Sequence, residues 1–438
     1  MKSAPRKAGK KPAVREKRIS NIVRPSDLTS KEWQVALRRQ AAQKENLIVR
    51  QPADEGRYGV YEVSNPLSRS VYKVVYRGLA SKWNFCSCPD FKTNQLGTCK
   101  HIEAVKIWRT DHRKGRLGDL PPYSSLYLTY SECRTVRIRI GSVRRASMRL
   151  LASEYFSADG VALPGKVAEL EGFIIRAKEL DPDFRCYPDV LDYISETKDS
   201  DYRKGFLSKL TDKDLDGLLK TSLYPYQKEG IRFAFGKGKS IIADEMGLGK
   251  TVQAIGAAEL LRKAGLVSSV LIICPTSLKY QWQKEIEKFT DSSALVIEGD
   301  PVKRAQMYKS DVFYKIVSYH AMNRDVRLKG EMFAECVIMD EVQRLKNWNT
   351  QIARSARHIH SDYSIVLSGT PLENKLEDLY SVMQLVDQYC LGPYYKFVEE
   401  TTVRDDTGKV LSYRNLNMVS ELSLIHISEP TRLRCISY

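Results

Sequence analysis

The stretch Ser240 to Val252, reading SIIADEMGLGKTV, decides how the rest of this chain is interpreted. A short apolar run at 241–243 is followed by a glycine-rich turn that closes on Lys250 and Thr251, and helical spacing then resumes. This order predicts a strand, a phosphate-binding loop and a helix. In such a loop, backbone N–H groups point at a polyphosphate, a lysine contacts its outer phosphates, and a threonine hydroxyl ligates Mg²⁺.

Asp244 departs from the usual P-loop pattern, which has glycine five residues before the last glycine, here Gly249. The loop still keeps glycine at Gly247 and Gly249. We therefore expect Asp244, Gly247, Gly249, Lys250 and Thr251 to form the nucleotide site.

Length and composition limit the number of domains and the class of protein. At 438 residues with 42% apolar content, the chain has room for two or three domains with cores of their own. No window approaches the length of a membrane span, and the basic first residues precede no apolar segment, so we expect no signal peptide and no membrane. Nine scattered cysteines favour a reducing, intracellular location: cytoplasm or nucleoid in a prokaryote, nucleus in a eukaryote.

The net charge of +17 lies mostly at the N-terminus, because residues 1–120 hold 26 Lys and Arg against 11 Asp and Glu. A local excess of this kind favours a polyanion such as nucleic acid as partner, with a solvated basic tail as the alternative. Residues 1–26 lack apolar periodicity and are expected to be a disordered basic arm or a terminus without a partner. Ser30 is expected to cap a helix, and strands are expected at 58–63 and 71–76.

Cys86, Cys88, Cys99 and His101 form the second chemical signal. Three thiols and one imidazole complete a tetrahedral zinc set and leave no position open for a substrate water, so the predicted site is structural. The alternative is four residues that cluster without a metal. The motif C-x-C-P-D-F followed by C-K-H resembles the SWIM zinc finger over about residues 55–110. That resemblance implies contact with DNA or with a protein partner, and fusion to ATPases of the chromatin-remodeller type.

Residues 111–220 are interpreted as an accessory region without chemistry of its own. A strand is expected at 135–140 and an amphipathic helix at 167–180. Five arginines in this region either follow a phosphate backbone or form a solvated face: Arg134, Arg137, Arg139, Arg144 and Arg145.

From Leu223 onward, short apolar runs recur, each followed by polar residues. The runs lie at 240–243, 270–274, 294–297, 315–318, 336–339 and 364–367. This rhythm, with helical patterns between several of the runs, predicts buried parallel strands with crossover helices. In such a sheet, ligands bind beyond the carboxyl ends of the strands, where the polar residues fall.

Asp340 and Glu341 follow one of these runs, about 90 residues after the loop. Asp340 is suited to hold Mg²⁺ and Glu341 to orient and deprotonate an attacking water. Ser368, Gly369 and Thr370 follow the next run, either as hydrogen-bond partners of the acids or as an ordinary turn. Gln227 is a candidate for the adenine edge, although an isolated glutamine is more often simply on the surface.

These segments together resemble the first RecA-like lobe of superfamily two helicases, most closely the Swi/Snf-type ATPases. The matching pieces within 223–385 are LYPYQKEG, DEMGLGKT, CPTSLKYQWQKEI, DEVQRLKN and LSGTPLENKLEDLYS, and DEMGLGKT is this family's usual spelling of the loop. The resemblance implies translocation along duplex DNA driven by ATP hydrolysis. It assigns Gln227 to adenine, Lys250 to the phosphates, Thr251 and Asp340 to Mg²⁺ and Glu341 to the water. It also assigns Pro275, Thr276 and Ser277 to the DNA backbone.

The resemblance also implies a second RecA-like lobe, for which the residues after Glu400 have no matching pattern. The segment 422–432, LSLIHISEPTR, resembles translated read-through of a sequencing-library adapter, so we expect the natural sequence to end near Glu421, the alternative being a divergent natural tail. We expect little hydrolysis by this chain alone, because an arginine from the other lobe supplies a factor of about 10³ to 10⁵ in related systems.

The expected fold class is α/β, a RecA-like parallel-sheet lobe preceded by a small α+β zinc-binding domain. The expected domains are a basic arm, 1–26; a zinc-finger domain, 27–118; an accessory domain, 119–220; the lobe, 221–421; and an artefactual tail, 422–438. Two alternatives to the DNA translocase remain at this point. One is an RNA helicase, against which the DEMGLGKT and DEVQ spellings argue, and the other is a non-enzymatic zinc-dependent scaffold, which the intact phosphate loop and acids disfavour.

Overall fold

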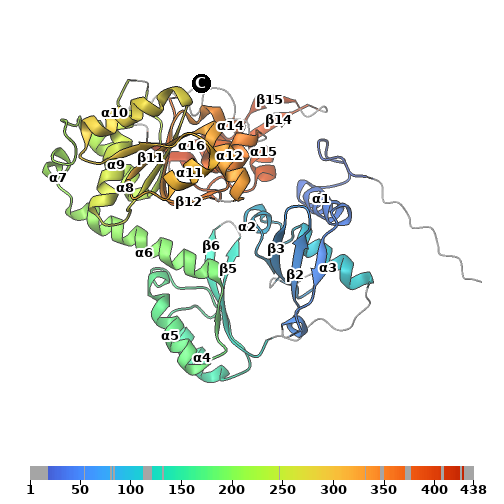
Figure 1. Ribbon diagram of the computed structural model, residues 1–438. Helices are drawn as coiled ribbons and strands as arrows, with labels where there is room; N and C mark the ends of the chain where they lie inside the picture. The colour runs from blue at the N-terminus through green and yellow to red at the C-terminus, as the bar shows by residue number, and fades with distance from the viewer. Residues whose placement is uncertain are drawn as a thin grey trace, which may run out of the picture. The chain divides into compact units, whose positions relative to one another are not determined.

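The computed structural model (Figure 1) describes residues 18–53, 55–78, 81, 84–111, 121–130, 133–245, 247–330, 332–345, 350–369, 376–405, 409–424 and 427–428. The chain divides into two compact units. The first comprises residues 1–119 with 404–411, and the second residues 120–403 with 412–438. Most of the predicted basic arm lies outside the described residues.

The first unit begins with helix α1, Ser30–Lys44. Thr29, rather than the expected Ser30, caps it: the Thr29 hydroxyl accepts from the Glu32 N–H, and the Glu32 carboxylate accepts from the Thr29 N–H at 2.9 Å. The expectation was wrong by one residue because Glu32 lies three positions after Thr29, the spacing of a capping box.

An antiparallel sheet with strand order β1-β2-β3-β4 follows α1 in the first unit. Its strands are β1 Ile48–Arg50, β2 Val60–Asn65, β3 Ser70–Val75 and β4 Phe85–Cys86, and the short helix η1 Gly56–Tyr58 lies between β1 and β2. Helices α2 Pro89–Asn94 and α3 Lys100–Asp111 complete this unit. The two predicted strands are confirmed as β2 and β3. Val63 and Val74 on the sheet and Ile102 on α3 are fully buried, so sheet and helix share an apolar core.

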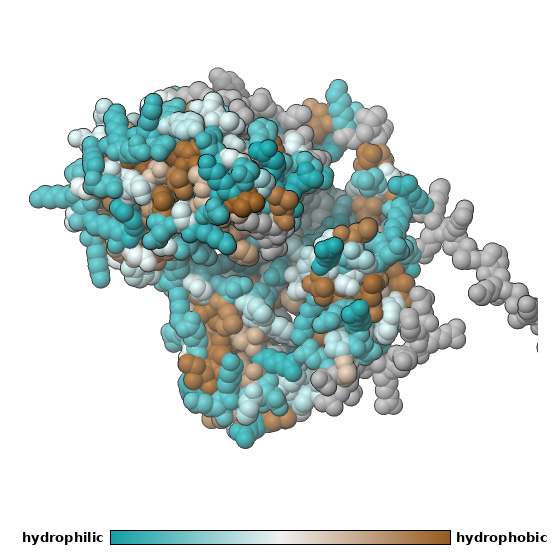
Figure 2. All heavy atoms as spheres, viewed as in Figure 1, coloured by the Kyte–Doolittle hydropathy of each residue, from teal (hydrophilic) through white to brown (hydrophobic). Residues whose placement is uncertain are grey.

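The second unit opens with a three-stranded sheet of order β6-β5-β7. Its elements are β5 Ser125–Tyr130, β6 Arg134–Arg139, α4 Arg145–Ser153, η2 Val167–Glu169, α5 Leu170–Leu180, β7 Arg185–Cys186, α6 Pro188–Lys209 and α7 Asp212–Asp216. The strand predicted at 135–140 is confirmed as β6, and the helix predicted at 167–180 as η2 with α5. Leu126, Met148 and Phe173 are fully buried between this sheet and its helices. Figure 2 shows hydrophobic side chains gathered over the region of α4 and α5.

Two arginines of the predicted basic stripe are engaged inside the protein. Arg134 lies over the rings of Tyr193 and Tyr389, with its guanidinium carbon 4.8 and 4.7 Å from their centroids. Arg139 donates to the backbone carbonyl of Pro121 at 3.0 Å. These two side chains therefore link the accessory sheet to neighbouring residues of the protein. The two alternatives for the stripe, contact with a phosphate backbone and a solvated face, did not include this structural role.

The largest sheet has the strand order β10-β11-β9-β12-β13-β8-β16. Its strands are β8 Lys239–Ile242, β9 Val270–Cys274, β10 Ala294–Val296, β11 Tyr314–Ser318, β12 Met332–Met339, β13 Ile359–Leu367 and β16 Ile427–Ser428. All of its neighbouring strands are parallel. The six apolar runs predicted as parallel strands are thus confirmed, each within a few residues of its expected bounds.

Helices and short helical turns connect these strands. They are α8 Pro225–Lys237, α9 Lys250–Lys263, η3 Thr276–Leu278, α10 Lys279–Phe289, α11 Pro301–Tyr308, α12 Tyr319–Lys329, η4 Val342–Leu345, α13 Gln351–Ala356 and α14 Leu376–Met383. An α/β architecture with crossover helices is confirmed for this part of the chain.

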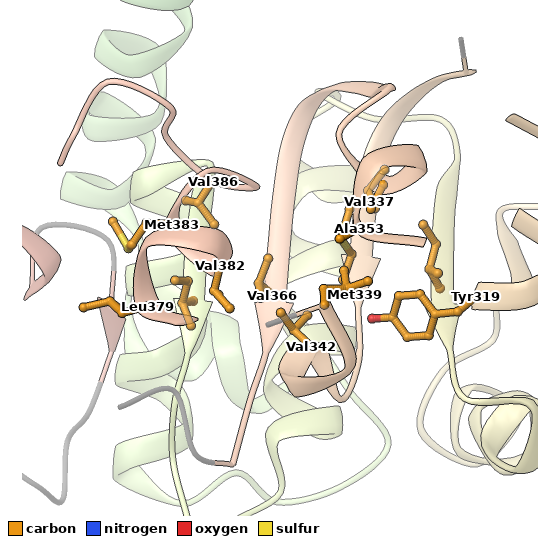
Figure 3. Close-up of a cluster of buried hydrophobic side chains, with 14 of the residues drawn as sticks. Tyr319, Val337, Met339, Val342, Ala353, Val366, Leu379, Val382, Met383 and Val386 are labelled. Atoms are coloured by element: carbon orange, nitrogen blue, oxygen red, sulfur yellow. The ribbon is translucent and has the colours of Figure 1, made fainter. Parts of the chain in front are cut away.

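The sheet separates two apolar clusters, because alternate residues of a strand point to opposite faces. On β12, Val337 and Met339 belong to one cluster, shown in Figure 3 with Val366 and Leu379. The neighbouring Ile338 belongs to the other cluster. With both faces covered, the carboxyl edge of the sheet is the part left for polar chemistry.

The C-terminal elements are α15 Tyr394–Thr401, β14 Thr402–Arg404, β15 Val410–Tyr413 and α16 Leu416–Leu424, followed by β16. The predicted domain boundary near Glu421 falls inside α16, and Ile427, within the adapter-like segment, pairs with Ile241 of β8. Whether the natural sequence ends there stays a prediction. Within the described part of the chain, no helix is long and apolar enough to cross a membrane.

Candidate ATP site and candidate metal centre

The predicted phosphate loop joins the carboxyl end of β8 to the first turn of α9. Gly247 has φ of 88° and Gly249 has φ of 72°, conformations that L side chains rarely adopt. Gly249 is the residue before α9, so these turns direct the backbone into the helix. Lys250 opens α9, and its Nζ donates to the carbonyl oxygens of Asp244 at 2.9 Å and Glu245 at 3.0 Å. The predicted strand, loop and helix are therefore present, with the lysine directed into the loop.

Gln227 lies against this loop and is buried. Its Oε1 accepts from the Tyr224 N–H at 3.0 Å, and its Nε2 donates to the Leu248 carbonyl at 3.4 Å. A Cβ at Gly249 would lie 2.5 Å from Nε2, and the φ of 72° at this position favours glycine. In this structure the Gln227 amide ties the start of α8 to the loop, and its contact with adenine stays a prediction.

Asp244, the departure from the usual loop, is almost fully buried. Its Oδ2 accepts from Gln253 Nε2 on α9 at 2.6 Å. Burial raises the pKa of the Asp244 carboxyl, against the opposing effects of this hydrogen bond and of the Lys250 charge. Gln253 was not among the predicted site residues, because one buried glutamine in a helix leaves no signal in the sequence.

Asp340 follows β12 and is held on three sides. Its N–H donates to the Ile273 carbonyl at 2.9 Å, its carbonyl accepts from the Tyr319 hydroxyl at 2.7 Å, and its Oδ2 accepts from Trp282 Nε1 at 2.9 Å. Burial raises the pKa of Asp340, while the Trp282 hydrogen bond and the Lys250 charge act in the opposite direction. Strands β8 and β12 both pair in parallel with β13, so the loop after β8 and the acidic pair after β12 lie at the same edge of the sheet.

Glu341 adopts a left-handed conformation with φ of 51°. This conformation is strained for a residue with a Cβ, and such residues concentrate at functional sites. The Glu341 N–H donates to Asp340 Oδ1 at 2.8 Å, and Gln343 Nε2 donates to Glu341 Oε2. The two acids are therefore fixed relative to each other, and Gln343 orients the second one.

The remaining predicted residues lie at the same edge. Thr251 is the second residue of α9. Ser368 follows β13, and its N–H donates to the Ile242 carbonyl of β8 at 3.2 Å, whereas Thr370 lies outside the described residues. Pro275 follows β9 and is buried, and Thr276 and Ser277 are exposed in η3. A long anionic ligand would thus meet exposed hydroxyl groups next to the acidic pair.

This arrangement suits phosphoryl transfer from a nucleoside triphosphate. The loop offers N–H groups and one ammonium, and the neighbouring strand ends offer one carboxylate for a divalent cation and a second for a water. Phosphoryl transfer depends mainly on positioning and on charge stabilisation, and both come here from residues fixed by backbone and side-chain hydrogen bonds.

The four predicted zinc ligands converge in the first unit. Cys86 lies on β4, Cys88 precedes α2, Cys99 directly precedes α3, and His101 is the second residue of α3. Their ligand atoms all lie within 4.8 Å of one another, and all four residues are buried. His101 Nδ1 is 3.8 Å from Cys86 Sγ and 3.9 Å from Cys99 Sγ. A tetrahedral zinc ion would place sulfur and nitrogen about 3.6 Å apart, so the four atoms fit this metal.

The chemistry of the four side chains also favours a cation. Burial raises the pKa of the Cys86 and Cys99 thiols, whereas hydrogen bonds from these thiols lower the pKa of Cys88. Three buried thiolates would repel one another without a positive charge among them. The His101 ring packs on Tyr72 with a centroid distance of 4.7 Å, which fixes the orientation of the imidazole.

Comparison with known proteins finds a described domain that matches the part of the chain with the candidate ATP site. Residues 226–427 match the model of the SNF2-related domain. An "Uncharacterized ATP-dependent helicase" of Mycoplasma pneumoniae is 37% identical over 189 residues, 41% of this chain and 18% of that protein. Chromodomain-helicase-DNA-binding protein 8 of Danio rerio is 29% identical over 198 residues, 41% of this chain and 8% of that protein.

Among solved structures, the Sulfolobus solfataricus SWI2/SNF2 ATPase core in complex with dsDNA aligns with a TM-score of 0.43 and 30% identity, covering 48% of this chain and 45% of that one. The chain spans less than a fifth of the length of the two curated relatives, at 18% and 8%. The matched residues 226–427 include every predicted ATP-site residue.

Proposed function

We propose that the SNF2-related domain of this chain binds Mg²⁺ and ATP, hydrolyses the γ-phosphate, and uses this reaction to move along duplex DNA. The observation that carries the proposal is that Lys250, Asp340 and Glu341 lie at one edge of the parallel sheet, after strands that both pair with β13. The relatives described as an ATP-dependent helicase and as chromodomain-helicase-DNA-binding proteins support the same class.

Each residue has a distinct task in this proposal. Gly247 and Gly249 shape the loop around the phosphates, and Lys250 binds the outer phosphates. Thr251 and Asp340 would hold Mg²⁺, which when bound draws negative charge from the phosphate oxygens. Glu341 accepts a proton from the attacking water, and Gln343 holds its carboxylate in position.

Duplex DNA is the proposed track because of two features of the chain. The exposed hydroxyl groups of Thr276 and Ser277 lie at the end of β9, beside the strand that carries Asp340. The N-terminal quarter holds most of the excess positive charge, which favours a polyanionic partner. A second RecA-like lobe in the full-length protein, completing the ATP site from the other side, belongs to the same proposal.

For the first unit, we propose a structural zinc ion held by Cys86, Cys88, Cys99 and His101. The proposed role of this SWIM-like module is contact with DNA or with a protein partner. The four buried ligand atoms within 4.8 Å of one another carry the zinc assignment.

ATP turnover with and without duplex DNA tests the proposed enzyme. We expect Lys250→Ala and Glu341→Gln each to lower DNA-stimulated turnover by at least about 100-fold, the scale seen when one group that stabilises a transition state is removed. The assay should include a longer version of the protein with the proposed second lobe. Nucleotide binding that survives in Glu341→Gln would place its role in the chemical step.

Two outcomes would favour the alternatives. Equal turnover in wild type and Glu341→Gln would support a non-enzymatic scaffold. Stimulation by RNA duplexes in place of DNA would support an RNA helicase.

A further inference from the structure

Asp340 forms hydrogen bonds with residues before and after the proposed DNA-contacting segment, residues 275–277. Before the segment, the Ile273 carbonyl accepts from the Asp340 N–H at 2.9 Å. After it, Trp282 Nε1 donates to Asp340 Oδ2 at 2.9 Å. Residues 274–281 therefore form a short loop and helical turn whose two ends are both attached to one acid.

The connection through Trp282 is a single, well-defined contact. Trp282 is 2% exposed, and it packs with the apolar cluster that includes Ile286 on the same helix. Its indole N–H is a donor only, and Asp340 Oδ2 is its partner. A buried donor that loses its acceptor costs free energy, so a shift of α10 and a shift of the Asp340 carboxylate are energetically linked.

The segment between these two contacts is compact. η3, Thr276–Leu278, runs directly into α10, Lys279–Phe289, and the Leu278 N–H donates to the Pro275 carbonyl at 3.0 Å. A phosphate bound at Thr276 or Ser277 would therefore act on the first turn of α10, the turn that contains Trp282. In this way the proposed contact point for DNA and the candidate Mg²⁺ ligand are joined by hydrogen bonds on both sides of residues 274–281.

We infer that Trp282 is a positioning residue that couples occupancy of the segment 275–277 by a nucleic-acid backbone to the carboxylate of Asp340. The inference rests on the proposed function, since it requires that both ligands bind. It goes beyond that function by naming the contact through which one ligand changes the affinity for the other. Because such coupling is reciprocal, nucleotide must change the affinity for DNA by the same factor.

The test is the affinity of the 438-residue chain for a fluorescein-labelled DNA duplex, by anisotropy, with and without Mg²⁺ and a non-hydrolysable ATP analogue. We expect the analogue to change the wild-type Kd by a factor of about 5 or more, the lower end of common coupling factors. Trp282→Phe, which lacks the N–H, should bring this ratio close to one. Trp282→His keeps an N–H in a smaller ring, so it should retain more of the ratio than Trp282→Phe despite greater loss of packing.

Tyr280→Phe is the matched control on the same helix. Tyr280 is half exposed and its hydroxyl donates to Glu298, not to Asp340, so the ratio should equal that of wild type. A second measurement uses wild type alone: duplex DNA should slow amide hydrogen exchange at 339–341. If the Trp282 variants do not fold, this measurement tests the coupling in wild type, and exchange at 339–341 that DNA does not slow would contradict it.

The outcomes separate this inference from the proposed function. A wild-type chain that binds neither ligand contradicts the function itself. A chain that binds both, with a ratio of one or with the same ratio in Trp282→Phe, overturns the role of Trp282 and leaves the function standing. A greater loss in Trp282→His than in Trp282→Phe would assign the residue to packing alone and would also overturn it.

Discussion

In the parallel-sheet lobe, the site residues follow strands that are buried on both faces by large apolar clusters. In the first unit, called the N-terminal unit below, the four candidate metal ligands lie on and around a sheet whose strands are two to six residues long. The lobe fixes its acids and loop through hydrogen bonds that need no ligand, such as that from Trp282 to Asp340. In the cysteine and histidine cluster, the four ligand atoms lie within 4.8 Å of one another, and the proposed zinc ion would hold them together.

This contrast indicates where the folding free energy of each region originates. In the lobe it comes from apolar burial, which exists before any nucleotide binds. In a small unit with short strands, a bound metal supplies much of the folding free energy itself. The two regions should therefore respond to different perturbations, and each region can serve as the reference when the other is perturbed.

Removal of zinc should have the largest effect. We expect one zinc per chain, and chelation or Cys88→Ser should unfold the N-terminal unit, because structural zinc contributes on the order of 10 kcal/mol in comparable sites. Metal analysis together with hydrogen exchange measures the content and the loss of protection, while the lobe should remain protected. Cys186→Ser is the matched control outside the cluster. Absence of zinc, with Cys88→Ser leaving protection unchanged, would contradict the metal site.

Truncation of the lobe core should have the next largest effect. Ile272 is fully buried on β9, an interior strand of the sheet. Ile272→Ala should lower the free energy of unfolding of the lobe by about 3 kcal/mol, because it removes buried methyl groups and leaves a cavity. Urea denaturation measures this change, and the zinc content should equal that of wild type. A loss of zinc in Ile272→Ala would show that the regions are not independent.

The pH dependence of lobe stability should show a smaller effect, through Asp244. Burial raises the pKa of this carboxyl in the folded chain, whereas the unfolded chain ionises it at the ordinary aspartate value. The folded state therefore holds more protons between these two values, and stability falls as pH rises from the ordinary value through the raised one. Asn at this position keeps an oxygen for Gln253 and does not titrate. Asp244→Asn should therefore gain melting temperature relative to wild type across this window.

Scanning fluorimetry from acidic to neutral pH measures this difference in melting temperature, which should be smaller than the effect of Ile272→Ala. A difference between Asp244→Asn and wild type that does not vary with pH would contradict the linkage.

The order in which the cysteines react with a thiol label should distinguish the two regions, and this measurement needs no substitution. Cys133 is exposed and should react first with a maleimide at neutral pH. Burial raises the pKa of Cys274 and of Cys336 to about 12, so these two should react only when the lobe unfolds. Cys88 should react on chelation of zinc, before Cys274 does. Mass spectrometry of the labelled peptides gives the order of reaction. Reaction of Cys274 before Cys88 would contradict the expectation that the N-terminal unit depends on zinc and the lobe does not.

Much of this fold could be predicted because its signals are local. Runs such as 270–274 are apolar and β-branched, and each forms a strand close to its expected bounds. Strand order could not be predicted in this way, because β8 and β13 pair across more than 100 residues of chain. The same limit applied to the site: its acids and loop follow motifs, whereas the bond from Trp282 to Asp340 joins residues 58 positions apart.

Glu341 carries one more consequence through its left-handed backbone, with φ of 51°. Glycine adopts this conformation without strain, so replacing the glutamate by glycine relieves a cost of about 1 kcal/mol or more while removing the proposed proton acceptor. A laboratory selection for heat-resistant variants, made without a requirement for turnover, would therefore favour loss of this acid. Thermostability and activity compete at this single position, and a screen of this lobe has to measure both.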